Sequence, residues 1–349
     1  MKHYRIQQDN LKTFIQEVFT TLGLTKDAAQ TVADNLVEAE LREVKSHGVT
    51  KVKEYTKRIE AKVFNNNPHL KVISEGISTL AIDGDFGMGA VTGKWAMEAC
   101  IAKAKITGAA FATVAKGQHF GMAAFYSMMA LKHDMVGIAL CNSGNIMTVY
   151  GGTSRVLGTN PISIAVPANK HYPLVFDAAT SQAAFNRILV ANLEGRDIPE
   201  GWAIDKDGKP TVKANEAVTG AVVPFGGYKG SGLAIMVEVL SGVLSSAFLA
   251  ATVHADRVST GVGFFLGAIR IGDFLDVDVF KQGVDELTDH LKASRYEEGT
   301  EVIYMPGELE YLRKEKNSKL GVEISFAVLQ DLLEVQQLYG IKTILEYEK

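Results

Sequence analysis

Residues 109–121 read AAFATVAKGQHFG and join an apolar run to a glycine-bounded loop. The run from Phe111 to Val114 is rich in apolar and β-branched residues, which is typical of a buried strand. A helix is expected to begin near Met122, so His119 lies in a loop between a strand and a helix. This strand–loop–helix order in the middle of the chain predicts an α/β fold.

Segments of the same kind occur on both sides of this stretch. Each is short, apolar and bounded by Gly, Pro or Asn, so we expect strands there and a mixed sheet. The further predicted strands are residues 70–73, 79–82, 136–140, 162–166 and 174–176, with a helix over about 89–104.

The two ends of the chain read as helices. Leu11, Phe14, Ile15 and Val18 follow the spacing of one apolar helix face, and similar stripes begin near residues 25 and 50. The tract 65–68, NNNP, ends that pattern, and helices return from about residue 229 to a last one over 326–339. We therefore expect a helical N-terminal part (1–66) that packs with a helical C-terminal part (230–349), and an α/β cofactor-binding domain (67–229) between them.

Composition narrows the class of partner. The chain has 349 residues, 47% of them apolar, and its 36 basic and 40 acidic residues give a formal net charge of −4. Such a chain has no field that attracts nucleic acid or an anionic membrane, so a small-molecule partner is expected. Cys100 and Cys141 lack ligand spacing, which predicts neither disulfide nor metal site. The polar start lacks a signal peptide, and we expect a cytoplasmic protein.

One stretch, residues 232–253, has the length of a membrane-spanning helix. Its only charge, Glu238, lies near its middle, and three serines and Gly242 interrupt its apolar character. No aromatic or basic belt flanks it, so a helix packed inside the protein explains it better than a membrane span.

Three glycine clusters occur without a GxGxxG or GxxxxGK[ST] pattern, so the sequence predicts no Rossmann or P-loop site. Residues 84–89 and the glycines between 151 and 158 suit turns. Residues 224–232, PFGGYKGSG, are more specific because Lys229 stands among glycines just before an apolar helix. Backbone N–H groups and an ammonium at a helix N-terminus can hold a phosphate.

Two of the eight histidines lie in unusual contexts, and we expect the other six to be structural or exposed. His47 follows Ser46 at a junction of two helices, and His119 occupies the loop described above. A group that titrates near neutral pH suits the interconversion of an alcohol and a carbonyl. Ser46 could donate to a developing oxyanion and Lys51 could hold a substrate carboxylate, while hydride would come from a cofactor.

Eight motifs, taken in order, carry a resemblance that spans about residues 10–340. They resemble those of the malate/L-lactate dehydrogenase family, which includes ureidoglycolate, sulfolactate and diketogulonate oxidoreductases. The motifs are SHG at 46–48, QHFG at 118–121, GTNP at 158–161, FDAAT at 176–180, IPEGWA at 198–203, PFGGYKGSG at 224–232, LSGVL at 240–244 and MPGE at 305–308.

The resemblance implies an NAD(P)-dependent oxidoreductase of 2-hydroxy and 2-oxo acids, on a non-Rossmann fold and as a homodimer with sites near the subunit interface. It implies that His119 is the acid/base, that Ser46 and His47 contact substrate and nicotinamide, and that Tyr55 faces the substrate. NAD is the expected cofactor and NADP the alternative. The positions that match dinucleotide-binding ones are Ser143, Thr159, Asn160, Asp177, Ala178, Ala179, Lys229, Gly307 and Glu308.

Two departures from the family pattern bear on binding. Lys51 stands where many members have an arginine that grips a carboxylate with two parallel bonds. Residues 183–187, AAFNR, replace an arginine-glycine-lysine run near the cofactor. Malate, lactate, ureidoglycolate and diketogulonate all fit as substrates, and the competing interpretation is a catalytically silent dinucleotide-binding or scaffold protein of the same fold.

Overall fold

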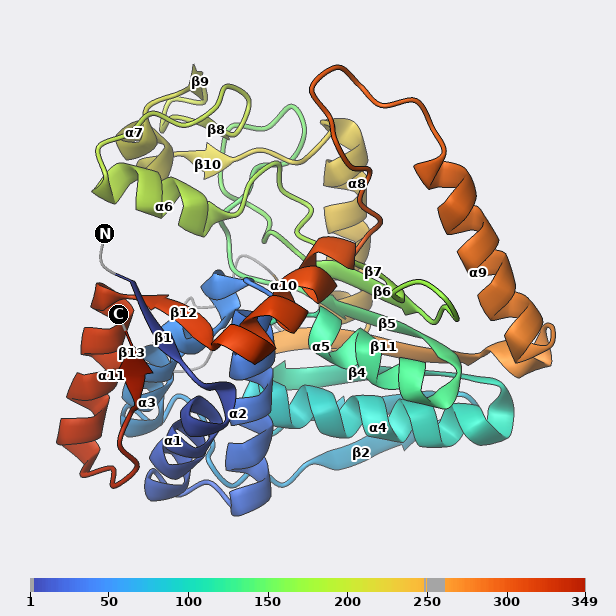
Figure 1. Cartoon of the computed structure of the whole chain (residues 1–349), viewed down its shortest axis with the longest axis horizontal. Coiled ribbons are helices and arrows are strands. Elements are labelled where there is room, and N and C mark those ends of the chain that lie inside the picture. The colour runs from blue at the N-terminus through green and yellow to red at the C-terminus, as the bar shows by residue number, and fades with distance from the viewer. Residues whose placement is uncertain (1–2, 248, 250–260, 349) are drawn as a thin grey trace.

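A seven-stranded sheet forms the centre of the molecule in the computed structural model, which describes residues 3–247, 249 and 261–348 (Figure 1). The strand order is β2-β3-β4-β11-β5-β6-β7, with β3 parallel to β4 and every other pair antiparallel. The strands are β2 Lys71–Glu75, β3 Thr79–Asp83, β4 Ala109–Gly117, β5 Met135–Cys141, β6 Ile162–Val166, β7 Leu174–Ala178 and β11 Val262–Arg270. The mixed α/β fold predicted from the sequence is confirmed.

The strand β11 was not predicted, because the region after residue 230 was expected to be helical. It lies between β4 and β5, where Phe264 pairs with Val114 on one side and with Cys141 on the other. A continuous apolar run of this length fits a buried strand or a buried helix equally well, and strand pairing decides between them. A segment near the C-terminus therefore completes the centre of the sheet.

Helices cover the sheet and bury its central strands. The helix α4, Gly89–Thr107, packs on β4 and β11, and the short α5, Ala124–Ser127, packs on β5. Cys100 and Cys141 are both buried free thiols in this core. Burial of the Cys100 thiol raises its pKa to about 12, so it stays protonated.

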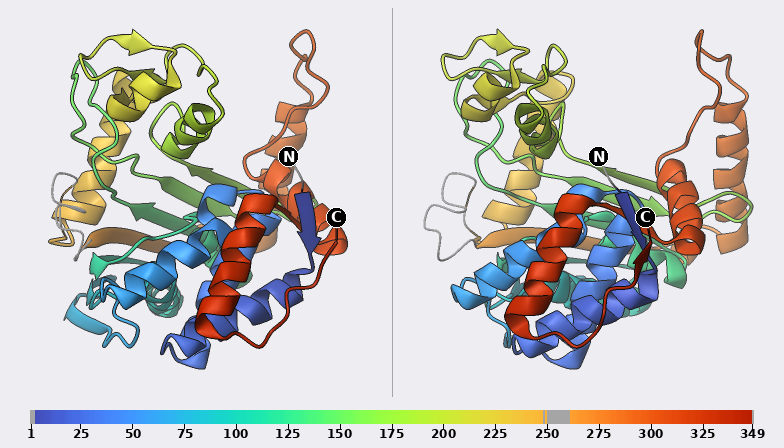
Figure 2. Two further views of the ribbon diagram at one scale, coloured as in Figure 1. Left: turned by 90° about the vertical axis from the view of Figure 1, so that its left-hand side faces the viewer. Right: turned by 60° about the vertical axis from the view of Figure 1, so that its left-hand side comes forward.

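A separate core lies among the helices near the two ends of the chain. The N- and C-terminal ends lie on the same side of the molecule, where β1 pairs with both β12 and β13 (Figures 1 and 2). The elements of this unit are β1 His3–Ile6, α1 Gln8–Thr21, α2 Lys26–Leu41, α3 Val52–Glu60, β12 Val322–Ser325, α11 Phe326–Tyr339 and β13 Tyr347–Glu348. The domain boundary at residues 66–67 stays a prediction.

A third core lies in a small layer beyond the sheet, at the upper left of Figure 1. Its elements are α6 Phe185–Leu193, β8 Ala203–Ile204, β9 Pro210–Thr211, α7 Ala214–Thr219 and β10 Ala221–Val222. The helix α8, Tyr228–Val237, contributes Ala234 to this core and continues as a π-helical turn, Glu238–Val243. On the other side of the molecule, α9, Val277–Lys292, stands away from the sheet and is followed by α10, Glu308–Leu320 (Figures 1 and 2).

The apolar stretch that begins at Gly232 is only partly packed inside the chain. Leu233, Met236 and Leu244 are 43%, 53% and 58% exposed, which corrects the expectation of an internal helix. Residues 248 and 250–253 of this stretch, and His254, lie outside the described residues. Within the described part of the chain, no helix is long and apolar enough to cross a membrane.

Candidate active site

Ser46, His47, Tyr55 and His119 meet where the terminal helical unit contacts the sheet, and we call them the His119 cluster. The Oη of Tyr55 lies 2.6 Å from Nδ1 of His119. The rings of His47 and His119 are stacked, with centroids 5.6 Å apart and planes 9° from parallel, and the Oγ of Ser46 lies 2.8 Å from Nδ1 of His47. The segment 46–55 and the distant loop after β4 thus supply one cluster of polar side chains.

The loop after β4 is tied to the helical unit beside His119. The neighbouring Gln118 is fully buried, and its Nε2 donates to the carbonyl oxygen of Val63, 3.0 Å away. Tyr55 is 3% exposed in α3, so its ring has little freedom to move. These contacts fix the position of the imidazole from two sides.

The turn that carries Ser46 and His47 rests on a buried carboxylate. Glu40 is 2% exposed, and its Oε1 accepts from the backbone N–H of Val49 at 2.9 Å. A Cβ at position 48 would lie 2.2 Å from that oxygen, so Gly48 is what lets the turn approach Glu40. Desolvation raises the pKa of Glu40 to about 7. Glu40 was not predicted from the sequence, because it has no local signal beyond its place in α2.

The two histidines of the cluster differ in what they can do. Desolvation, with the charge of Lys51, lowers the pKa of His47 to about 4, so this imidazole is neutral at pH 7. Desolvation, with the charge of Glu54, raises the pKa of Tyr55 well above its ordinary value, so the phenol keeps its proton. The imidazole of His119 is therefore stacked on a neutral ring and bonded to a neutral phenol.

Lys51 directly precedes α3 as its N-cap residue, and its ammonium has a partner already. Its Nζ lies 2.8 Å from Oε2 of Glu54, and the other oxygen of Glu54 lies 2.7 Å from Nη2 of Arg58. The carboxylate of Glu54 therefore forms ion pairs with two cations. Among the described residues, the buried Nη1 of Arg58 has no hydrogen-bond partner. The group carries a net positive charge beside the His119 cluster.

A second group of predicted residues meets at the loops beyond the ends of β5, β6 and β7. The backbone N–H of Ser143 donates to Oδ1 of Asn160 at 3.0 Å, and the carbonyl of Thr159 accepts from the N–H and Oγ1 of Thr180 at 2.8 and 2.9 Å. Thr180 in turn accepts at its carbonyl from the N–H of Phe225, which leads into the glycine loop of Lys229. We call Ser143, Thr159, Asn160, Thr180 and Lys229 the loop cluster.

The glycine loop of Lys229 packs tightly on this cluster. A Cβ at Gly230 would lie 2.2 Å from the carbonyl oxygen of Phe225 and 3.0 Å from that of Thr180, so only glycine fits. Gly227 caps the N-terminus of α8. Lys229 is exposed and forms no ion pair with any described residue. A helix N-terminus and an unpaired cation therefore stand beside the ends of two strands.

Asp177 and Ala178 end β7, and Ala179 follows them before Thr180. The Oδ2 of Asp177 accepts from the backbone N–H of Ala124 at 2.8 Å, at the start of α5. Asp177 thereby connects this edge of the sheet to the helix that follows His119. Desolvation raises the pKa of its carboxyl to about 6.

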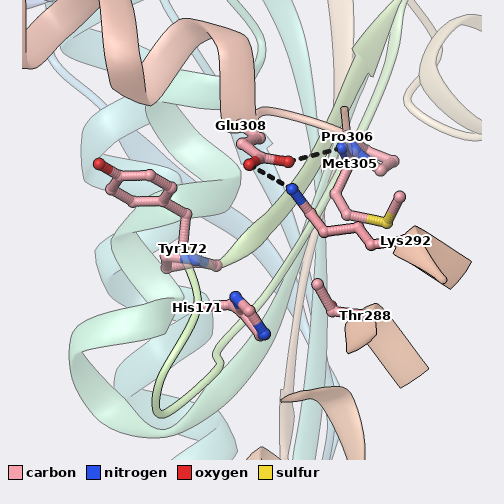
Figure 3. A pocket seen from close by; sticks show the side chains of 8 residues that line it. His171, Tyr172, Thr288, Lys292, Met305, Pro306 and Glu308 are labelled. Carbon is pink, nitrogen blue, oxygen red and sulfur yellow. Dashed lines mark hydrogen bonds and ion pairs between the residues drawn. The ribbon is translucent and has the colours of Figure 1, made fainter. Parts of the chain in front are cut away.

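Gly307 and Glu308 lie beside β7, but Glu308 is engaged within the chain. The carbonyl of Pro306 accepts from the N–H of Val175, and Gly307 caps α10. Glu308 accepts from Lys292 Nζ at 2.6 Å and from the N–H of Met305 at 2.9 Å (Figure 3). These two bonds hold the pKa of Glu308 below its usual value.

Two cavities of the described chain lie away from His119. A pocket lined by Glu308, Lys292 and His171 has a volume of about 20 Å³, room for about one water molecule (Figure 3). A hollow of about 550 Å³ lies at the end of α3, among Val63, Phe64 and Phe86. His119 lines neither. In the described part of the chain, no group of three or more His, Cys, Asp or Glu side chains could hold a metal ion.

With this geometry in hand, comparisons with known proteins identify the family. The family model described as malate/L-lactate dehydrogenase matches residues 6–333. The chain belongs to the malate/L-lactate dehydrogenase family. Relatives in this family include dehydrogenases of 2-hydroxy acids, among them malate, sulfolactate and ureidoglycolate dehydrogenases. Among the relatives, malate dehydrogenase of Pyrococcus horikoshii is 38% identical over 97% of each chain, and ureidoglycolate dehydrogenase (NAD(+)) of Escherichia coli K12 is 30% identical over 94% of this chain and 95% of its own.

Solved structures agree with the family assignment. Sulfolactate dehydrogenase of Methanocaldococcus jannaschii superposes with a TM-score of 0.90 at 37% identity, covering 97% of this chain and 98% of its own. The family fold predicted from the motifs is therefore confirmed.

The residues present suit a nicotinamide dinucleotide, the cofactor expected in this family. Buried in the loop cluster, the Oγ of Ser143 has no hydrogen-bond partner among the described residues, and an unpaired Lys229 stands at a helix N-terminus. Hydroxyl groups and phosphates of a dinucleotide would satisfy both.

Proposed function

We propose that this chain catalyses the NAD-dependent interconversion of a 2-hydroxy acid and a 2-oxo acid. The observation that carries the proposal is the 2.6 Å contact between Tyr55 and His119, with the neutral His47 stacked on His119. It is the arrangement expected of an oriented acid/base, and it stands beside a cation and a set of loops suited to a dinucleotide.

In this proposal His119 moves the proton. When its Nδ1 carries a hydrogen, that N–H donates to the Tyr55 oxygen, and Nε2 is the nitrogen that accepts the proton of a substrate hydroxyl. In the reverse direction, the protonated ring delivers the same proton to the developing alkoxide. The Tyr55 hydroxyl keeps its own proton. It can therefore accept from Nδ1–H while the ring gains or loses a proton at Nε2, and the contact holds the ring orientation in both directions.

Ser46 and Lys51 bind the substrate in this scheme. Ser46 donates a hydrogen bond to the substrate oxygen, and Lys51 holds the carboxylate. For that, the substrate carboxylate must share the ammonium of Lys51 with Glu54. The malate, sulfolactate and ureidoglycolate dehydrogenases among the relatives indicate that the substrate is a small acid of this class.

Bound near His119, the nicotinamide would supply or accept the hydride. The residues proposed to hold the dinucleotide are the loop cluster with Asp177, Ala178, Ala179, Gly307 and Glu308. Lys229 and the N–H groups at the start of α8 would face the phosphates, and Ser143 would donate from its hydroxyl group.

We propose NAD rather than NADP as the cofactor, because the carboxylate of Glu308 would repel a 2′-phosphate and accept from ribose hydroxyls. For that, the ribose must share this carboxylate with Lys292 and the N–H of Met305. Replacement of Glu308 by Gln should then narrow the ratio of kcat/KM for NADH over NADPH by about threefold. Steady-state assays with both cofactors measure the ratio. A wild-type enzyme that uses NADPH better, or a ratio unchanged in the variant, would end this assignment.

We propose a homodimer on the strength of exposed apolar side chains on two helices. On α8, Leu233 and Met236 are 43% and 53% exposed, and on α9, Val279 and Leu287 are 57% and 49% exposed. Such surface is unusual on a monomer and typical of an interface. Sedimentation velocity should give twice the monomer mass, and a single species of 37.8 kDa at micromolar concentration would contradict the dimer.

The main proposal is tested by measuring the oxidation of NADH and of NADPH with a panel of 2-oxo acids. The panel contains the 2-oxo acids that correspond to malate, sulfolactate and ureidoglycolate, together with pyruvate and a diketogulonate. Turnover with at least one of these acids at about 1 s⁻¹ or more is expected, since typical enzymes reach about 1 to 1,000 s⁻¹. A chain that binds NADH but turns over none of the panel would instead be the catalytically silent dinucleotide-binding protein.

A further inference from the structure

Glu238 joins two asparagines into a buried network behind the loop cluster. Its Oε1 accepts from Nδ2 of Asn142 at 3.0 Å, and its Oε2 accepts from Nδ2 of Asn160 at 2.9 Å. Glu238 is 8% exposed, and both asparagines are fully buried. The network lies at the start of the π-helical turn that follows α8, and such turns often occur at functional sites.

Backbone groups fix the direction of these bonds. Oδ1 of Asn142 accepts from the N–H of Gly263 at 2.8 Å, and Oδ1 of Asn160 accepts from the N–H of Ser143 at 3.0 Å. Since a backbone N–H can only donate, each asparagine must turn its oxygen toward it and its amide nitrogen toward Glu238. Nδ2 of Asn160 also donates to the carbonyl of Ala234 at 3.0 Å.

Two amide nitrogens therefore converge on one side chain, and only a carboxylate accepts from both. A glutamine at position 238 would turn its own NH₂ group toward one of them. If Asn142 flipped to accept from it, its nitrogen would face the N–H of Gly263. If Asn160 flipped, its nitrogen would face the N–H of Ser143, and its oxygen would face the carbonyl of Ala234. Neither flip restores the network.

The network connects segments that carry the proposed cofactor contacts. Asn142 directly precedes Ser143, Asn160 directly follows Thr159, and Glu238 continues the helix that begins beside Lys229. Asn160 is held at a φ of +31°, a conformation that asparagine tolerates better than most side chains. A shift of any member would move the hydroxyl of Ser143 relative to the N-terminus of α8.

We propose that Glu238 is a positioning residue for the nicotinamide dinucleotide, acting through Asn142 and Asn160 to hold the loop cluster in its binding geometry. This inference rests on the proposed function, because it needs NADH to bind at the loop cluster. Glu238 itself touches neither substrate nor cofactor in this scheme, so it affects binding through the positions of Ser143, Asn160 and α8.

The first measurement is the Kd for NADH, from its fluorescence, in the full chain carrying Glu238→Gln. The loss of one buried hydrogen bond should raise Kd by about 10- to 100-fold, because the mismatched amide distorts the bound geometry. The acid/base cluster is untouched, so kcat at saturating NADH should keep its pH profile while KM for NADH rises with Kd.

A rescue in the same chain tests whether the direction of these hydrogen bonds is what matters. In the double variant E238Q/N142D, the new carboxylate at position 142 can accept from both the N–H of Gly263 and the new amide nitrogen at position 238. The amide oxygen at position 238 still accepts from Asn160, so Kd should return to within about threefold of the wild-type value. In E238Q/N160D, a carboxylate would face the carbonyl of Ala234, and binding should stay weak or weaken further.

Glu17→Gln is the matched control. Glu17 also accepts several bonds, from the N–H of Lys342 and the N–H and hydroxyl of Thr343, but it ties α1 to the C-terminal segment. This variant should lower the thermal midpoint and leave Kd for NADH unchanged. Comparison with Glu17→Gln therefore shows whether a rise in Kd comes from general destabilisation of the fold or from displacement of the binding loops.

The outcomes distinguish the two proposals. If wild-type protein binds no NADH, the proposed function fails. If wild type binds and Glu238→Gln binds equally well, or if both double variants recover equally, only the positioning role is overturned. If Glu238→Gln does not fold, the two double variants still test the network. Recovery of folding and NADH binding in E238Q/N142D but not in E238Q/N160D supports it. Recovery in both double variants, or in neither, contradicts it.

Discussion

The His119 cluster and the loop cluster hold their side chains in different ways. In the His119 cluster, reactive side chains contact one another directly, as in the 2.6 Å contact of Tyr55 with His119. In the loop cluster, backbone groups and small residues make the surface, and a buried network that includes Glu238 fixes them from behind. We propose that the first region transfers the proton and that the second holds a large polar ligand.

This difference indicates that turnover should depend on the ionisable groups of the His119 cluster, and that cofactor binding should depend on the positions of the groups in the loop cluster. Ionisable groups with perturbed pKa values support the His119 cluster, among them His47, Tyr55 and Glu40. The contacts of the loop cluster are mostly between neutral donors and acceptors. Substitutions should therefore separate turnover from cofactor binding according to the region they affect.

The largest effect should come from His119→Ala. The variant should fold and bind NADH with unchanged Kd, while kcat falls by about 100- to 10,000-fold, the usual range for a positioned acid/base. His133→Ala, at an exposed histidine outside both clusters, is the matched control and should keep full turnover. Near-normal turnover of His119→Ala across pH 6 to 9 would remove His119 from the mechanism.

The buried carboxyl of Glu40 should make stability depend on pH. Its pKa in the folded chain, about 7, is above its ordinary value of 4.5, so the folded state binds this proton more tightly. The protonated carboxyl therefore contributes fully to the free energy of unfolding below pH 4.5, and this contribution is lost as the pH rises to 7. The loss amounts to at most about 3 kcal/mol. Relative to wild type, Glu40→Gln should therefore gain stability over this interval.

Urea unfolding at pH 5 and pH 8 measures this effect, with Glu38→Gln as the control. The pKa of Glu38 is lowered by Lys314 and Arg42 despite its burial, so its loss should cost stability at high pH rather than add it. Equal stability changes for Glu40→Gln at both pH values would show that Glu40 is ionised in the folded chain throughout.

In the loop cluster, Lys229→Ala should raise Kd for NADH by about tenfold, because an exposed ammonium contributes a modest charge-assisted bond to a phosphate. Turnover at saturating NADH should stay within about twofold of wild type. Titration at 50 and 300 mM salt should show a smaller salt dependence for the variant. A drop in saturated turnover with unchanged Kd would place Lys229 in the chemistry instead.

The smallest effect concerns the substrate carboxylate. Lys51→Arg should lower KM for the 2-oxo acid by about threefold, since a guanidinium can bind with two parallel bonds even with Glu54 beside it. Lys53→Arg, whose native ammonium pairs with Asp331 and Glu334, is the control and should change nothing. If neither Lys51→Arg nor Lys51→Ala moves KM, the carboxylate is held elsewhere, with Arg187 the next candidate.

The sequence predicted most strands and the terminal helices from their apolar spacing, and it singled out Ser46, His47 and His119 by residue type beside glycines. Tyr55 lies on an apolar helix face, so its place in the site was predicted only by the resemblance to the family. The sequence missed β11, because a buried apolar run carries no periodicity that separates strand from helix. It also missed Glu40 and Asn142. Glu238 had a signal, a lone acid in an apolar stretch, but only the fold brings it within reach of Asn142 and Asn160.

The central claim, that one region moves the proton and the other holds the cofactor, is tested most directly by a double-mutant cycle of His119→Ala and Lys229→Ala. The measured quantity is kcat/KM for NADH at saturating 2-oxo acid. Independent regions predict that the two losses multiply, within about a factor of two. A double variant no worse than His119→Ala alone would show that both residues act in one step and would contradict the division of labour.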